Sequence, residues 1–372
     1  MQKTSKNEIF TKFISWVFRR NPPELIIFKS TLCALVGIFG VDLIGGFFIS
    51  SDQLQITAIL NPGKLIPPSV LYPIFIILAT ALIGSLFIAW LKFQDNRRKE
   101  SRKKVIVVEG RGLRDDNGKA LVDAIPGSIL GHRQSYLLDL RQQIDGKVLK
   151  PEDALWKIKA MKIATQQLKC GSDSNDVTMV YGGLTSVPFT FLTGIELDDE
   201  GLVETFDWDR NQEEWRQLDE IDDNKRFEIE GLNTIENQED IVLAVAVSYP
   251  VNDSDLLSTF NWPIVRMSLR QISSNSHWSI DKQIALADQF LETIKKLSSV
   301  RVKRIHLVLA APNSVVFLLG RRFDKRNLPR VIVYQYEREN LPAYPWGVEM
   351  PVSGKEEAKI INLELSESIC RH

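Results

Sequence analysis

Two serines in this 372-residue chain stand where short helices are expected to begin, directly after apolar stretches of sequence. Ser186 follows the glycine pair 182–183, and Ser314 follows the turn 311–313. The first N–H groups of a helix have no partner within it and attract anions, and glycine lets a ligand approach the backbone closely. The pattern predicts phosphate binding, although serine is also a common helix cap and a glycine pair a common turn.

Aromatic and basic residues occupy similar positions. Tyr181 and Tyr249 end predicted strands and could stack on unpaired bases, and Arg111 follows the first strand and could pair with a phosphate. Taken singly, each residue more often has an ordinary structural role, so the hypothesis depends on their joint position at strand ends in two halves of the chain. The candidate set is Gly110, Arg111, Tyr181, Gly182, Gly183, Thr185, Ser186, Ser248, Tyr249, Ala311, Pro312, Asn313 and Ser314.

The elements that must position these residues form the same series twice. VTMVYGGLTSVPF from Val177 aligns with IHLVLAAPNSVVF from Ile305, an offset of 128 that pairs Ser186 with Ser314. Helices are expected from Pro151 in the first series and after Ser279 in the second. Apolar runs of buried-strand type lie at 105–108, 177–181, 203–208, 241–247, 304–310 and 330–336.

Strands joined by long helical crossovers are typical of a parallel sheet with helices on its faces. Ligands of such sheets bind beyond the carboxyl ends of the strands. Two fused copies would face each other about a pseudo-two-fold axis and share one cleft, so the natural occupant should itself be roughly symmetric. The expected fold class is α/β, with two fused Rossmann-like units.

Two apolar segments precede these units. Residues 30–49 contain one charged residue, Asp42, and residues 70–91 contain none. At about 1.5 Å per residue, each helix would reach about 30 Å, the thickness of a bilayer core. Two transmembrane helices are therefore expected, with buried core helices as the alternative. Lysines and arginines flank the pair on both outer sides, whereas the loop between them has only Lys64, so both termini are expected in the cytoplasm.

Charge supports this division into parts. Residues 1–104 carry 14 Lys/Arg and 6 Asp/Glu, which leaves 32 and 41 for the rest of the chain. The three scattered cysteines exclude a disulfide framework. The expected organisation is a cytoplasmic segment (1–29), a two-helix membrane region (30–91), a basic linker (92–104) and a cytosolic domain (105–372) with halves of about 105–238 and 239–345.

The spans carry features beyond hydrophobicity. Ala81, Ser85 and Ala89 recur every four residues, a small-residue stripe that lets helices pack closely within one chain or between chains. A carboxylate in mid-span is costly, so Asp42 is either protonated and bonded to a neighbouring helix or lines a water-filled path. We assign it to the path. Two spans cannot enclose a pore, so a channel would require a homo-oligomer.

The segments IHLVLAAPNSVVFLLGRRFD and PRVIVYQYER resemble the C-terminal signature of SAVED domains, which look like two fused CARF-type units. That signature is a strand, an Ala-Ala-Pro turn, a short helix ending in Leu-Gly-Arg and a strand ending in Tyr-x-Tyr-Glu. Two membrane spans joined to such a domain look like the transmembrane effectors of CBASS anti-phage systems.

The resemblance implies a sensor of a cyclic di- or trinucleotide, for example cyclic GMP-AMP, made by a cognate nucleotidyltransferase. It implies a multi-pass protein of the bacterial inner membrane, which oligomerises and forms or opens a pore that arrests infected cells. It implies no enzymatic activity, metal or other cofactor. Bulkier residues at the glycine pair 182–183 are then expected to weaken ligand binding more than folding.

Catalysis and polymer binding find little support. The four histidines lack metal-ligand spacing, and GxSxG, P-loop and GxGxxG motifs are absent. Alternation would place Asp207 and Asp209 on one face of a strand, where solvation is the expected role. Residues 196–240 carry 18 acidic and 4 basic side chains, which argues against DNA or RNA polymers. Basic residues at 301–330 could meet phosphates or a neighbouring chain.

Two alternatives remain open: a membrane-tethered enzyme that degrades the cyclic nucleotide, and a passive anchor that recruits a partner. The integrity of the ligand after incubation tests the enzyme, and ion flux through liposomes that contain the pure protein tests the anchor. The separation of sensing from output also predicts that residues 105–372, expressed alone, bind the ligand without toxicity.

We expect Asp42→Asn to change the current or the ion selectivity of the protein in liposomes. Asparagine keeps the shape and hydrogen-bonding capacity of the side chain but removes its ionisable charge. The ligand concentration for half-activation should shift little, because sensing is expected in residues 105–372. Wild-type conductance and selectivity in the variant would contradict the path and leave Asp42 as a helix-packing residue.

Overall fold

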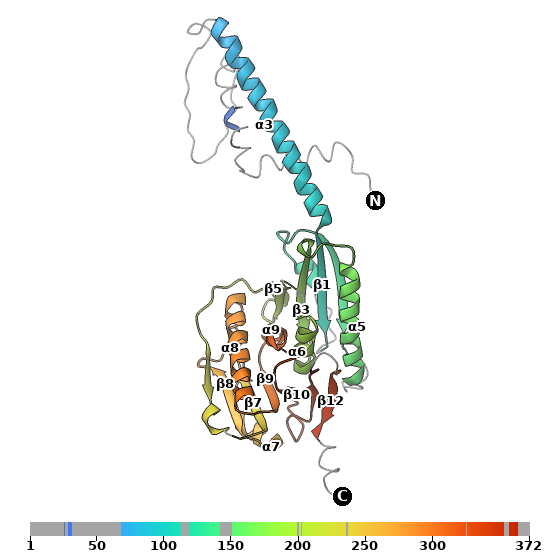
Figure 1. Ribbon diagram of the computed structural model, residues 1–372, viewed down its shortest axis with the longest axis vertical. Coiled ribbons are helices and arrows are strands. Elements are labelled where there is room, and N and C mark those ends of the chain that lie inside the picture. Colours follow the sequence, from blue (N-terminus) through green and yellow to red (C-terminus); the bar gives the residue numbers. More distant parts are fainter. Residues whose placement is uncertain are drawn as a thin grey trace. The chain divides into compact units, whose positions relative to one another are not determined.

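The computed structural model describes residues 26, 29–31, 68–112, 119–141, 151–198, 201, 203–235, 237–324, 326–352 and 357–363 (Figure 1). The chain divides into two compact units, residues 1–101 and 102–372, which are treated separately below. Asp42 and nearly all of the first predicted span lie outside the described residues.

Helix α3 (Pro68–Arg102) contains the second predicted span. Its segment Tyr72–Asp95 has a mean hydropathy of 2.5 over its most apolar window, and it is long and apolar enough to cross a membrane. Ser85, Ala89 and Phe93 form one buried face, while large apolar side chains such as Phe87 are exposed on the others. The helix is therefore confirmed, and its exposed apolar surface suits a lipid environment.

The first sheet of the second unit has five strands in the order β2-β1-β3-β4-β5. The first four strands of this order are parallel, and β5 is antiparallel to β4. Their bounds are β1 Lys104–Arg111, β2 His132–Asp139, β3 Val177–Leu184, β4 Val203–Asp209 and β5 Glu214–Gln217.

The second sheet has seven strands in the order β12-β11-β10-β9-β7-β8-β6. Its parallel centre, β8-β7-β9-β10, repeats the order β2-β1-β3-β4 of the first sheet. The duplication expected from the sequence is thus confirmed. The bounds are β6 Phe227–Glu230, β7 Asp240–Ala246, β8 Ile264–Leu269, β9 Arg304–Ala310, β10 Arg330–Gln335, β11 Trp346–Glu349 and β12 Lys359–Asn362.

In the described part of this unit, four helices pack between or beside the sheets, and two short ones cover the outer faces. The helix α6 follows β3 but also packs on β10 and β11, and α9 follows β9 but also packs on β3 and β4. Each half therefore covers part of the other half's sheet, and one apolar core runs through both. The bounds are α4 Leu121–Ala124, α5 Pro151–Lys169, α6 Val187–Glu196, α7 Asp253–Thr259, α8 Ile280–Ser299 and α9 Asn313–Arg322, with 3₁₀ turns at Ser174–Asp176 and Leu232–Thr234.

The outer faces of the sheets have separate apolar clusters. Leu121 of α4 lies in the cluster on the first sheet, and Leu256 of α7 lies in that on the second. His306 belongs to the second face, where its ring stacks on Trp262 at 3.8 Å between centroids. Burial lowers the pKa of His306 to about 4, so at neutral pH it is an uncharged packing residue.

Helices α6 and α9 cross at a pair of glycines. A Cβ at Gly194 would clash with the carbonyl oxygen of Phe317, and a Cβ at Gly320 would clash with that of Phe191. The two contacts are reciprocal at an offset of 126 residues, which also relates the bounds of the two helices. The offset of 128 is therefore wrong by two residues in this region, and Ser186 is equivalent to Pro312.

We expect Gly194→Ala to lower the free energy of unfolding by about 1–3 kcal/mol or more, because the added methyl must push the two backbones apart. Thermal melting of the purified full chain measures the change. Gly127→Ala is the matched control, since a Cβ there would meet nothing within 4 Å. Equal melting temperatures for the two variants would contradict a close crossing.

Candidate functional site

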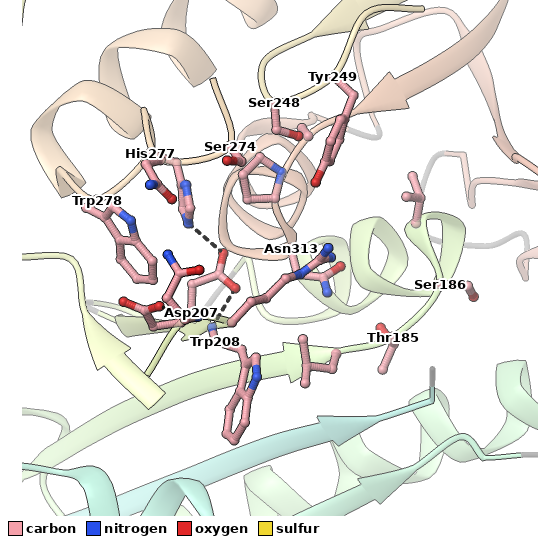
Figure 2. Close-up of a pocket in the computed structure, with 18 of the residues that line it drawn as sticks. Thr185, Ser186, Asp207, Trp208, Ser248, Tyr249, Ser274, His277, Trp278 and Asn313 are labelled. Carbon is pink, nitrogen blue, oxygen red and sulfur yellow. Dashed lines mark hydrogen bonds and ion pairs between the residues drawn. The ribbon is translucent and has the colours of Figure 1, made fainter. Parts of the chain in front are cut away.

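A pocket of about 430 Å³ lies between the two halves, at the carboxyl ends of the parallel strands (Figure 2). Strands of both sheets and the loop before α8 contribute to it, as expected for two parallel sheets that face each other. The lining residues are Leu184, Thr185, Ser186, Val187, Asp207, Trp208, Asp209, Arg210, Asn211, Ser248, Tyr249, Ser274, Asn275, His277, Trp278, Ala311, Pro312, Asn313 and Gln335.

The structure brings seven residues of the candidate set together in this pocket. They come from segments far apart in the sequence that follow β3, β7 and β9. Ligand sites of parallel sheets lie beyond the carboxyl ends of the strands, which is why these residues were expected to meet there. Their role toward a ligand stays a prediction. They are Thr185, Ser186, Ser248, Tyr249, Ala311, Pro312 and Asn313.

The glycine pair is not a ligand-facing turn. Gly182 and Gly183 lie inside strand β3, and their missing side chains leave room for other parts of the protein. A Cβ at Gly182 would lie 3.0 Å from both Leu121 and Trp215, and a Cβ at Gly183 would clash with the hydroxyl of Tyr181. Bulkier residues are therefore expected to damage packing, and the ligand-facing turn on which the expected selective loss of binding rested is corrected to a packed strand.

Tyr181 is a core residue and not a stacking platform. Only 1% of it is exposed, and its ring stacks on Phe317 with 3.7 Å between centroids. Burial, reinforced by the charge of Asp207, raises the pKa of the Tyr181 phenol. A base cannot reach either the ring or the hydroxyl without unpacking α9, so the predicted stacking role is corrected.

Three further candidates lie outside the pocket lining. Arg111 forms an ion pair with Glu109 at 2.6 Å. Gly110 packs against the methyl group of Thr185, where a Cβ would lie 3.1 Å away. Ser314 is buried, and its hydroxyl accepts a hydrogen bond from Gln283 at 2.9 Å. Gly110 and Ser314 thus support lining residues of the pocket from behind, at Thr185 and Asp207 respectively.

Asp207 and Asp209 are buried in the pocket wall, which corrects the expectation of surface solvation. The alternation of β4 does place both on one face, but this face meets the second half of the chain. Asp207 Oδ2 accepts a hydrogen bond from the N–H of Ser314 at 3.1 Å, and its Oδ1 accepts one from the N–H of Trp208 at 2.8 Å. The carboxylate thus occupies the N-terminus of α9, where a phosphate was expected.

Four residues close a ring of polar contacts between the halves. Nε2 of His277 lies 3.5 Å from Oδ2 of Asp207, which in turn accepts the Ser314 N–H. Nε2 of Gln283 donates to the Ser314 hydroxyl at 2.9 Å and to the carbonyl of His277 at 2.6 Å. Burial lowers the pKa of His277 although Asp207 opposes the shift, so the imidazole is neutral at pH 7.

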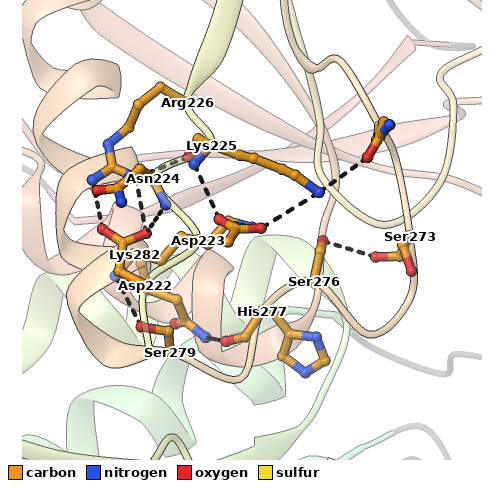
Figure 3. Close-up of polar contacts among 12 residues, drawn as sticks. Asp222, Asp223, Asn224, Lys225, Arg226, Ser273, Ser276, His277, Ser279 and Lys282 are labelled. Carbon is orange, nitrogen blue, oxygen red and sulfur yellow. Dashed lines mark hydrogen bonds and ion pairs between the residues drawn. The ribbon is translucent and has the colours of Figure 1, made fainter. Parts of the chain in front are cut away.

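A second polar network holds the loop that carries His277 (Figure 3). The ammonium of Lys282, 2% exposed, pairs with Asp223 at 2.9 Å, and the hydroxyl of Ser279 caps α8 by accepting from the Lys282 N–H. Arg226 pairs with Asp222 at 2.6 Å and lowers the pKa of that carboxyl. The segment 222–226, which lies between β5 and β6, therefore anchors the loop before α8 that forms part of the pocket wall.

Tyr249 is the most exposed aromatic residue of the pocket lining. Tyr249 is 53% exposed at the end of β7, and Trp208 is half-buried with its ring against Trp215. Figure 2 shows Tyr249 and Trp208 on opposite sides of the drawn residues. Alternation along β4 points the ring of Trp208 away from Asp207 and Asp209 and onto the outer cluster of the first sheet, whereas the exposed ring of Tyr249 is open to the pocket. Trp208 and Trp278 escaped the sequence analysis, although a tryptophan at a strand end is a recognisable signal.

The basic cluster at 301–330 does not face the pocket. Arg304 pairs with Asp240, Arg322 with Asp288 and Arg330 with Glu349, each at 3.2 Å. None of the basic residues described in that segment lines the pocket, where Arg210 is the basic lining residue among those described. The expected phosphate contacts of the cluster are therefore absent from this pocket.

The described part of the chain offers no metal or nucleophile constellation. It holds no group of three or more His, Cys, Asp and Glu side chains that could bind a metal ion. Among the same residues, the Tyr334 hydroxyl does meet a histidine ring, that of His306 at 2.9 Å, but this buried pair belongs to the outer face of the second sheet and not to the pocket. The arrangement suits binding of a ligand with flat rings and hydrogen-bonding edges.

Family comparisons agree with this architecture. Residues 163–350, half of the chain, match the family described as "SMODS-associated and fused to various effectors sensor domain", abbreviated SAVED. Residues 5–155 match the "SAVED-fused 2TM effector domain". No curated protein matches the chain.

Solved structures show distant likeness. The Acinetobacter baumannii Cap4 SAVED/CARF-domain containing receptor with the cyclic trinucleotide 2'3'3'-cAAA has 11% identity and a TM-score of 0.45, covering 75% of this chain and 59% of that chain. The Moraxella osloensis Cap4 receptor has 11% identity and a TM-score of 0.41, covering 75% and 57%. The present chain thus spans less than two thirds of these receptors.

We expect Gln283→Met to lower the free energy of unfolding by about 1–3 kcal/mol, because it removes the donor that Ser314 and the His277 carbonyl share in a buried site. Denaturant unfolding of the full chain measures this loss. The control is Gln166→Met on the exposed face of α5, expected to stay within about 0.5 kcal/mol of wild type. Equal stability of both variants would show that this ring of polar contacts does not stabilise the fold.

Proposed function

We propose, on the premise that this chain belongs to the SAVED family of sensor domains, that the pocket between its halves binds a cyclic oligonucleotide. The observation that carries the proposal is one cavity built from strand ends of both halves, with the exposed ring of Tyr249 in its lining. Bases stack on such rings with about 1–3 kcal/mol each. A ring of nucleotides has the repeated bases that a duplicated site can contact.

The pseudo-two-fold arrangement supports a cyclic ligand over a single nucleotide. Segments after β3 and β4 line the pocket from the first half, and segments after β7 and β9 line it from the second. A cyclic di- or trinucleotide, of which cyclic GMP-AMP is one example, presents bases in more than one direction. The Cap4 receptor structure that contains a cyclic trinucleotide supports this ligand class by analogy.

The output that we propose is a pore. The chain is a SAVED sensor fused to a 2TM effector domain, and α3 suits a membrane crossing. Since two spans cannot enclose a channel, ligand binding must favour a homo-oligomer whose membrane helices form or open one. The ligand acts only through its preference for that arrangement, and a preference of about 10⁴-fold turns a 1:99 population into 99:1.

The topology follows from the basic residues on both outer sides of the spans. We place both termini and the SAVED domain in the bacterial cytoplasm, where a nucleotidyltransferase supplies the ligand after phage infection. Leakage through the inner membrane then arrests the infected cell. This is a non-enzymatic, antiviral role, and a degradative enzyme or a passive anchor is an outcome of the tests below.

We expect a panel of cyclic di- and trinucleotides, titrated by calorimetry into the full chain in nanodiscs, to contain at least one ligand. Tyr249→Ala should weaken its binding about tenfold or more, because a stacking surface is lost. The control is Trp156→Ala, which removes an exposed aromatic ring of α5 outside the pocket. Full affinity of Tyr249→Ala would contradict the site, and failure of every ring to bind would contradict the function.

Two readouts separate the alternatives once a ligand is known. Ion flux through liposomes that contain the pure protein should rise with the ligand, whereas a passive anchor gives no flux. Chromatography of the recovered ligand should show it intact, whereas loss of the ring would indicate the degradative enzyme.

A further inference from the structure

Asp209 presents a fixed acceptor oxygen at the pocket wall. It is the last residue of β4, only 8% exposed, and it lines the pocket. Its Oδ1 accepts hydrogen bonds from the N–H groups of Asn211 at 2.8 Å and Gln212 at 3.2 Å, which lock the carboxylate at the tip of the β4–β5 hairpin. Hydrogen bonds from the described residues reach Oδ1 and not Oδ2, so Oδ2 is open to a donor from a ligand.

The charges around the pocket are unusual for a site that takes a ligand with several phosphates. Two carboxylates, Asp207 and Asp209, line it, and Arg210 is its basic residue in the described part of the chain. Asp207 already accepts N–H groups on both oxygens. The free energy of binding must therefore come largely from bases and sugars, whose N–H and O–H groups a carboxylate attracts, and not from phosphate charge.

The edges of the bases differ in how they suit such an oxygen. The amino group of adenine lies between two ring acceptors, N1 and N7, which a carboxylate repels. Guanine places its amino group beside the N1–H, so two neighbouring donors point the same way. A carboxylate oxygen that is held in place can only accept hydrogen bonds, so it favours guanine over adenine.

We propose that Asp209 is the specificity-determining residue of this pocket and selects a cyclic oligonucleotide that contains guanine. The assignment rests on the proposed function, since it names the base read by the same site. Tyr249 offers an exposed ring for stacking from the second half of the chain. A base that stacks on this ring directs its hydrogen-bonding edge sideways, toward the pocket walls.

The test is calorimetric binding of two rings, matched in size and linkage, to the full chain in nanodiscs. Cyclic AAG and cyclic AAA, both with 3'–5' linkages, differ in one base, and cyclic di-GMP and cyclic di-AMP form a second pair. The guanine ring of at least one pair should bind about tenfold tighter or more than its adenine partner, as good base contacts discriminate by about 1–3 kcal/mol.

Asp209→Asn should abolish that preference. The guanine-containing cyclic oligonucleotide should bind more weakly, and the all-adenine one should bind as before or more tightly, since the carboxamide adds a donor. The control is Glu204→Gln, which neutralises another carboxylate of β4 outside the pocket lining and should keep the preference.

The outcomes separate the two proposals. Adenine rings that bind as tightly as guanine rings would overturn the role of Asp209 and leave the proposed function standing, as would an unchanged preference in Asp209→Asn. Binding only of guanine-free rings from the wider panel would also overturn the role of Asp209 alone, and failure of every ring of that panel to bind would overturn both. The comparison of rings on the wild-type chain decides the matter even where the variant does not fold.

Discussion

The close crossing of α6 and α9 is the constraint on which the rest of the sensor unit depends. Gly194 and Gly320 let each helix backbone touch the other, and larger residues at either position would separate them. Because each helix packs on the sheet of the opposite half, their separation sets the distance between the two sets of strand ends. The pocket therefore depends on this crossing, although neither glycine lines it.

Polar contacts then fix what the crossing brings together. Asp207 reaches from the first half to the N-terminus of α9, and Gln283 ties that end to the loop of His277. An anionic ligand cannot use the N-terminus of α9 unless Asp207 moves. The site thus offers aromatic surface and acceptor oxygens, which explains why its chemistry suits bases better than phosphates.

Sequence patterns predicted the duplicated α/β units, α3 and seven pocket residues, because apolar runs and the parallel-sheet rule carry that information. They misplaced residues whose roles depend on tertiary neighbours. Gly182 gives room to Leu121 and Trp215, which are distant in the sequence, and nothing local reveals this. Asp207 looked like a solvated carboxylate because one strand cannot show which partner covers its face. The helix equivalence was shifted by two residues, since a run of similar apolar residues aligns in several registers.

Hydrogen–deuterium exchange of the full chain in nanodiscs, with and without a bound cyclic oligonucleotide, tests most directly that one ligand occupies a site shared by both halves. The account predicts slower exchange in the first half at 185–187 and 208–211, and simultaneously in the second half at 248–249, 274–278 and 311–313. Protection confined to one half, or centred on segments outside the pocket, would contradict it.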